Sequence, residues 1–221
     1  MNPEAISGIK ATSRQCGELR SLLKEHLYNN SIIKGMFNKA ENFMTANQLT
    51  SGRSSQPGIA VFINGRPATD CCPFSESDTV TVSIALKSNY WASECSFSYS
   101  DTDSHLIETN RQAVIETAES LCPGLPFSDI AGVLEMSAGE YKIEPTDLQL
   151  TRPEASDIIF NLENEKGRLK AGSIINIKAV FSKTVKSPQT NGIAALCRHS
   201  ETVLITGNGA EILTINQLFV S

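Results

Sequence analysis

Residues 79–99 read TVTVSIALKSNYWASECSFSY, and this stretch decides the fold. From Thr79 to Leu86, polar or small residues alternate strictly with apolar ones, which places the valines and Ile84 on one face of a strand. The stretch from Tyr90 to Tyr99 alternates less regularly, and the turn at 87–89 would let it pair with the first run. We therefore predict two neighbouring strands of a sheet.

Helices are predicted on both sides of this strand pair, because apolar residues recur there at helical spacing. The apolar stripes run from about Pro3 to Tyr28, from residue 33 to residue 46, and from about Ser104 to Leu121. Ahead of the strand pair we expect a polar loop over Thr50–Gly58 and then a short β-branched strand over 59–63.

The second half of the chain repeats this order of elements. Residues 127–136 have a helical pattern, residues 141–150 are loosely strand-like, and residues 172–181 are typical of a strand. A hairpin is predicted over 201–214, where two β-branched runs flank Gly-Asn-Gly. Helices followed by strands, twice over, predict one α+β domain over 1–221 that is built from two similar halves.

Composition excludes several classes of protein. With 19 Lys and Arg against 24 Asp and Glu, the net charge is −5, so the chain lacks the basic footprint of a direct nucleic-acid binder. No apolar run approaches the roughly 18 residues of a membrane span, and the polar start is not typical of a signal peptide. The 6 cysteines include no CxxC pair, so we expect reduced thiols in cytosol or nucleus and no zinc site.

Familiar catalytic motifs are also missing from the sequence. It has no GxSxG elbow, no P-loop and no GxGxxG between a strand and a helix. We expect His26 to be solvated near a helix end, where its charged form would suit the helix dipole. A structural role is favoured for His199, and Trp91 is expected to pack in the core rather than stack on a ligand.

Two segments in the last quarter of the chain have a recognisable pattern. Residues 169–178 read LKAGSIINIK, and residues 198–206 read RHSETVLIT. Together with the order of helix, strand pair and a helix that ends in Pro-Gly, they resemble the methionine/Xaa-Pro aminopeptidase family. That resemblance implies the pita-bread fold, in which two pseudo-symmetric halves of helices pack on a curved antiparallel sheet.

The chemistry of this family needs two divalent metals, held by two aspartates, one histidine and two glutamates whose charge offsets that of the metals. Carried over one at a time, the resemblance puts Ser83 at the first aspartate and Glu94 at the second. It puts Lys178 and Ser200 at the two glutamates. A second histidine of the family, which handles substrate, falls near Thr69.

In the family, these positions line the cleft that holds the metals. The resemblance therefore implies a binding cleft in which the metal positions are degenerate. Residues 125–170, where the family has its ligand histidine, contain no histidine. A cation at Lys178 would cost several kcal/mol if it lay a few ångströms from a divalent metal. The resemblance therefore implies no metal, no cofactor and no peptidase activity.

Within this family, the chain resembles the aminopeptidase-like domain of the large subunit of the FACT histone chaperone. The comparable segments are Glu4 with Ile9–Ser13, the lysine-containing stretch Lys34–Glu41, the central strands over Ile84–Ser93, and Leu169–Ile177. This likeness implies a non-catalytic module in the nucleus that binds proteins or peptides, with histones or a chromatin complex as the partner. No direct contact with nucleic acid or membrane is expected.

Two alternatives stay open. The chain resembles ribosome-associated factors of the methionine-aminopeptidase type as well, and such a pseudo-aminopeptidase would be cytoplasmic. The other alternative is an active metal-dependent aminopeptidase, in which the ligands differ from the positions named above. The number of carboxylates and histidines in the cleft distinguishes these classes, and the residues above favour binding over catalysis.

Overall fold

The computed structural model of the chain describes residues 3–29, 33–52, 58–69, 72–89, 91–139, 145–151, 159–160, 167–187 and 190–215. The helices are α1 (Pro3–Asn29), α2 (Met36–Ala46), α3 (Ser104–Ser120) and α4 (Phe127–Gly139). The strands are β1 (Thr50–Ser51), β2 (Ile59–Ile63), β3 (Arg66–Pro67), β4 (Val80–Ser88), β5 (Trp91–Tyr99), β6 (Pro145–Thr151), β7 (Ile159–Phe160), β8 (Ile174–Ser187), β9 (Thr190–Ile205) and β10 (Ala210–Ile212). Among the described helices, none is long and apolar enough to cross a membrane.

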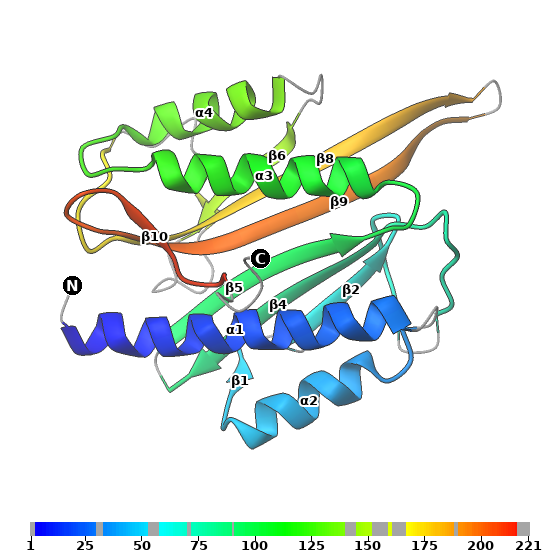
Figure 1. Cartoon of the computed structure of the whole chain (residues 1–221), viewed down its shortest axis with the longest axis horizontal. Coiled ribbons are helices and arrows are strands. Elements are labelled where there is room, and N and C mark those ends of the chain that lie inside the picture. The colour runs from blue at the N-terminus through cyan, green and yellow to red at the C-terminus, as the bar shows by residue number, and fades with distance from the viewer. Residues whose placement is uncertain are drawn as a thin grey trace.

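The described strands form one antiparallel sheet of 10 strands in the order β3-β2-β4-β5-β9-β8-β6-β7, with β1 beside β4 and β10 beside β9. In Figure 1, α1 and α2 pack against the β2–β4–β5 half, and α3 and α4 pack against the half with β8 and β9. The halves join where β5 meets β9, through the register pair Ser96↔Ser200. The expected α+β architecture of two similar halves is confirmed.

Strand β4 shows how alternation separates the two faces of the sheet. Val80, Val82 and Ile84 are fully buried in one apolar cluster with Leu19 and Leu23 of α1. Because successive side chains of a strand point to opposite faces, the residues between them face away from the helices. The helix side is therefore the apolar core, and the other face is free to carry polar groups.

Three expectations differ from the structure. Strands β8 and β9 extend well beyond the predicted strand at 172–181 and the predicted hairpin at 201–214, because their distal parts continue to pair, from Lys183↔Ala195 to Ser187↔Thr190. Thr50–Ser51, expected in a loop, pairs with β4. His26 is buried rather than solvated, and its Nε2 lies 3.0 Å from the carbonyl oxygen of Lys34.

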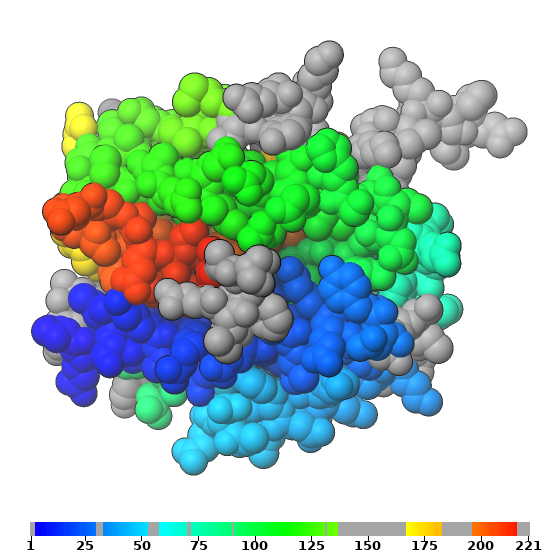
Figure 2. Space-filling view, in the orientation of Figure 1, coloured from blue at the N-terminus to red at the C-terminus, as the bar shows by residue number. Residues whose placement is uncertain are grey.

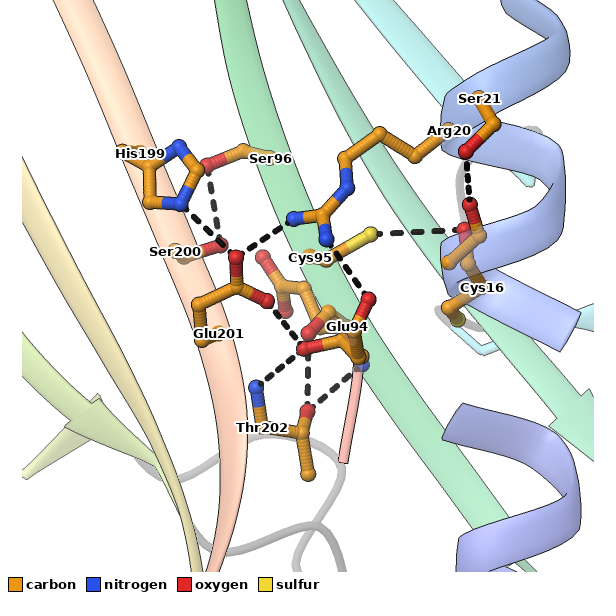
Figure 3. A network of polar contacts seen from close by, with 12 residues as sticks. Cys16, Arg20, Ser21, Glu94, Cys95, Ser96, His199, Ser200, Glu201 and Thr202 are labelled. Carbon is orange, nitrogen blue, oxygen red and sulfur yellow. Dashed lines mark hydrogen bonds and ion pairs between the residues drawn. The ribbon is translucent and has the colours of Figure 1, made fainter. Parts of the chain in front are cut away.

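A buried ion pair connects the first half of the chain to the second (Figure 3). The guanidinium of Arg20 on α1 donates from Nη1 to Oε1 of Glu201 on β9 at 2.7 Å, and from Nη2 to the carbonyl oxygen of Thr214 at 2.6 Å. His199 Nε2 lies 2.8 Å from the same Oε1, and the Thr214 hydroxyl donates to the other carboxylate oxygen. The side chain of Arg20 is 9% exposed and that of Glu201 is 1% exposed.

The charge states in this network follow from burial and from the partners. Burial opposes the negative charge of Glu201, but Arg20 and the hydrogen bond from His199 hold the pKa of this carboxyl at about 2. Burial lowers the pKa of His199, although Glu201 opposes this shift. His199 is therefore held neutral as a donor to Glu201, and the charged pair is Arg20 with Glu201.

Trp91 is partly buried and packs against a third apolar cluster that includes Ile9 and Ile174. A Cβ atom built on Gly8 of α1 would overlap the indole ring of Trp91, so the absence of a side chain at Gly8 lets the helix approach β5 closely.

We predict that Gly8→Ala lowers the free energy of unfolding by ~1–3 kcal/mol, because the added methyl forces the indole or the helix to move. Gly132→Ala is the matched control, since it also lies within a helix and a Cβ there meets nothing within 4 Å. Without a clash, the control should gain up to about 1 kcal/mol from helix propensity. Urea denaturation measures both changes, and equal effects would contradict the packing argument.

The network also predicts how stability depends on pH. The unfolded chain binds a proton at His199 below about pH 6.5, whereas burial disfavours this proton in the folded chain. The free energy of unfolding therefore has its full value above that pH and decreases as the pH falls. Glu201 adds a second loss of stability as the pH falls from 4.5, the ordinary pKa of its carboxyl, to about 2, the pKa of this carboxyl in the folded chain. Replacing His199 by Gln keeps a donor to Glu201 and removes the first loss.

The free energy of unfolding, measured at about pH 7.5 and about pH 5.5, should therefore fall more steeply in the wild type than in His199→Gln. The other histidines are common to both proteins, so the difference in slope reports His199 alone. Parallel slopes would show that His199 is not held neutral in the folded state.

Candidate functional site

A row of small and charged side chains crosses the sheet on the face that points away from the helices. Ser83 on β4 is directly opposite Ser96 on β5, Ser96 is opposite Ser200 on β9, and Ser200 is opposite Lys178 on β8. We call Ser83, Ser96, Ser200 and Lys178 the serine row. Three of the five sequence-predicted site residues thus lie side by side, although they are far apart in the sequence.

The hydroxyls of the serine row are buried. Ser83 is 3% exposed, and Ser96 and Ser200 are 0% exposed. The Ser96 hydroxyl donates to that of Ser200 at 2.9 Å, which links the two halves of the sheet where they meet (Figure 3). Lys178 is partly buried.

Arg198 adds a second cation to this face, and sequence reasoning missed it. Its Nη1 donates to the Ser83 hydroxyl at 3.4 Å, and its guanidinium carbon lies 5.4 Å from the centre of the Phe62 ring. Because β9 pairs Ser200 with Lys178 and Arg198 with Val180, Arg198 and Lys178 are diagonal neighbours, with Cα atoms about 7–8 Å apart. The signal was present in the sequence, since Arg198 and Ser200 share a face by strand alternation.

The other two predicted residues lie outside the serine row. Glu94 is on β5 in the adjacent row, where its carbonyl oxygen accepts hydrogen bonds from the Asn176 amide at 2.7 Å and the Thr202 hydroxyl at 2.8 Å. Thr69 follows β3 at the edge of the sheet, and the contacts described for it are with Cys72. Those hydrogen bonds lower the pKa of the Cys72 thiol.

The donors at these positions do not fit a pair of divalent metals. Hard divalent cations take several carboxylate oxygens, whereas this face offers neutral hydroxyls at Ser83 and Ser200, one carboxylate at Glu94 and an ammonium at Lys178. The guanidinium of Arg198 reaches the first aspartate position and would repel a metal there. In the part of the chain that the structure describes, no group of three or more His, Cys, Asp or Glu residues could hold a metal ion.

Known proteins resemble this chain in structure more than in sequence. No protein-family model matches the sequence, and no curated protein does. The methionine aminopeptidase of Rickettsia prowazekii superposes with a TM-score of 0.80 at 17% identity, over 97% of this chain and 98% of that one. The methionine aminopeptidase of Thermotoga maritima gives 0.79 at 15% identity, over 98% of both chains. The prolidase of Pyrococcus horikoshii gives 0.78 at 16% identity, over 98% of this chain and 63% of the prolidase.

At these identities, the likeness shows the fold and nothing finer. The sheet of two helix-covered halves is the one that these peptidases share. The chain therefore has the pita-bread fold of the methionine aminopeptidases and Xaa-Pro peptidases.

Proposed function

We propose that this chain is a non-catalytic pseudo-peptidase that binds proteins or peptides through the sheet face of the serine row. The observation that carries the proposal is the pair of cations on this face. The guanidinium of Arg198 bonds the Ser83 hydroxyl, and Lys178 lies opposite Ser200 in the register. A metal-activated water is the nucleophile in metallopeptidase chemistry, and these residues supply no set of anionic ligands to hold the metal.

The hydroxyls of the row do not replace that nucleophile. A serine needs an adjacent base to attack a carbonyl. The ring of His199 instead points to Glu201 on the helix side of β9, and the Ser96 hydroxyl donates to Ser200. Among the described residues, these contacts leave the row without a serine–histidine pair.

The charge of this face favours one kind of peptide. Lys178 and Arg198 would attract an acidic side chain or a C-terminal carboxylate, and they would repel the ammonium of a free amino terminus. A catalytic aminopeptidase needs the opposite preference, since its substrates present that ammonium. The change from carboxylates to cations therefore favours a different ligand as well as the loss of chemistry.

The partner that we propose is a histone or another component of a chromatin complex, in the nucleus. This rests on the resemblance of the sequence to the FACT domain and on the net charge of −5, which suits a basic protein and disfavours bare DNA. A histone would meet the acidic outer surface rather than the cationic face. A ribosome-associated role in the cytoplasm is the alternative for the same binding function.

An active metal-dependent aminopeptidase is the second candidate. The likeness to active peptidases and the carboxylate retained at Glu94 favour it. Metal content and turnover separate it from the proposal.

We predict that the purified protein, dialysed against manganese or cobalt, retains less than a stoichiometric amount of metal and does not cleave Met- or Xaa-Pro-peptides. The cations and hydroxyls described above give the reason. Elemental analysis and a peptide-hydrolysis assay provide the measurements, with an active methionine aminopeptidase treated in parallel. A metal in each chain, together with turnover that Glu94→Gln abolishes, would establish the second candidate instead.

We predict that a peptide with a free C-terminal carboxylate binds more tightly than its amidated form, and that Lys178→Glu weakens binding about tenfold or more, as expected for loss of a charge-assisted hydrogen bond. Lys170→Glu is the matched control, because Lys170 is exposed in the turn before β8 and makes the same change in charge. Fluorescence anisotropy with a labelled peptide gives the affinities. An equal loss in both variants would indicate a general charge effect rather than a site.

Binding of histones should respond differently. If it uses the acidic outer surface, raised salt should weaken it strongly while Lys178→Glu leaves it unchanged, because salt screens exposed charges more than buried ones. Tight binding of DNA at physiological salt would contradict the proposed partner.

A further inference from the structure

A pocket of about 360 Å³ lies on the helix side of the sheet, opposite the serine row. Its walls come from α1 and α3, which approach each other on the right of Figure 2, and its floor is formed by β5 and β9. The residues that line it include Lys24, Phe97, Ile107, Asn110 and Arg111. Its volume is at the small end of the range for ligand sites.

Positive charge concentrates at one end of this pocket. Burial lowers the pKa of Lys24, and the charges of Arg20 and Arg111 lower it further, with opposition from Glu201. The carboxylate of Glu201 is already engaged by Arg20, His199 and Thr214. None of the ion pairs among the described residues includes Lys24.

The acidic groups that line the pocket are occupied as well. Arg111 Nη1 donates to Glu108 at 2.8 Å, and the Tyr99 hydroxyl donates to Asp101 at 2.7 Å. Both carboxylates keep their negative charge, so an anion would be attracted only close to Lys24, in a partly buried place where charge pairs are weakly screened.

A second observation points to the same pocket. Asn110 is 1% exposed, and its amide nitrogen donates to the carbonyl oxygens of Cys197 at 3.3 Å and Ala179 at 3.4 Å. Its Oδ1 atom is buried and has no hydrogen-bond partner. Buried acceptors are nearly always satisfied, and Asn110 lines the pocket, so we assign this oxygen as the acceptor for a donor of the ligand.

The pocket also has an apolar part, beside the serines Ser98, Ser100 and Ser104 that line it. The ammonium of Lys24 lies 5.4 Å from the centre of the Phe97 ring, and Ile107 contributes from α3. A ligand for this pocket would thus present an anion to Lys24 and Arg111, a donor to Asn110 and an apolar group to Phe97.

We propose that this pocket binds a small carboxylate that carries a hydrogen-bond donor on the adjacent carbon and an apolar side group. Two sources share this chemistry: a free 2-hydroxy or 2-amido acid, and the C-terminal residue of a peptide. The site lies across the sheet from Lys178, although Arg198, which contacts Ser83, also lines it.

The test uses the full chain and four probes: phenyllactate, its uncharged amide phenyllactamide, hydrocinnamate, which lacks the donor, and a short peptide that ends in phenylalanine with a free carboxylate. Amide chemical shifts of the labelled protein locate binding and give affinities. Phenyllactate should shift signals of Phe97, Asn110 and Arg111. Phenyllactamide should bind at least about tenfold more weakly than phenyllactate, because the charge-assisted contacts are lost. Hydrocinnamate should also bind more weakly than phenyllactate.

Lys24→Met and Arg111→Met should each weaken phenyllactate about tenfold or more. Lys10→Met is the control on α1, since Lys10 pairs with Glu211 on the surface, and Lys178→Glu tests independence from the serine row. Both should leave the affinity unchanged. Thermal denaturation of each variant verifies folding, and Arg111→Met decides the case if Lys24→Met is unstable.

Every outcome of the test has a consequence. Binding of phenyllactate without the peptide supports a free acid as the ligand, and binding of both supports a peptide end. Equal binding of phenyllactamide, no binding of any probe, or a loss of affinity in Lys178→Glu equal to that in Lys24→Met would overturn the proposal. Failure here leaves the proposed function intact, because that function is tested at Lys178.

Discussion

The contact between Arg20 and Glu201 is the constraint on which the rest of the structure depends. It joins the first helix to the late strand β9 at a sequence separation of 181, near the place where β5 and β9 share the register pair Ser96↔Ser200. Both side chains are almost fully buried, so removing either partner would leave the other charge uncompensated at a cost of about 3–5 kcal/mol. Formation of the pair therefore requires that both halves of the sheet be correctly placed.

Strand β9 connects this constraint to the candidate site. His199 and Glu201 point to the helix side, whereas Arg198 and Ser200 point to the opposite face, as alternation requires. A slip of one residue would exchange the two sets and bring Ser200 beneath α1. Arg20 holds Glu201 on the helix side of β9. This contact therefore also fixes the register that places the serine row on the opposite face of the sheet.

The sequence predicted the parts of this arrangement that depend on local pattern. Alternation through 79–86 predicts β4, and the family resemblance identified Ser83, Lys178 and Ser200, which the register then places in one row. Alternation places Arg198 on the face of Ser200, but its contacts with Ser83 and Phe62 depend on the order of the strands in the sheet, which local pattern does not predict. The partner of Arg20 could not be predicted either, since helical periodicity places Arg20 near the apolar stripe without indicating which distant carboxylate it meets.

Cations lie on both faces of the central strands, and this has a consequence for the proposed recognition. The chain as a whole is acidic, with a net charge of −5, yet cations occupy both sides of the central strands: Arg198 and Lys178 on one face, and Arg20 and Lys24 on the other. Exposed acidic groups act at long range and are screened by salt, whereas the partly buried cations act only on a ligand that enters. A basic partner would therefore be attracted to the outer surface, while an anionic group would be selected only within the sheet face or the pocket. Under the two proposals above, the same chain would hold ligands of opposite charge at separate places.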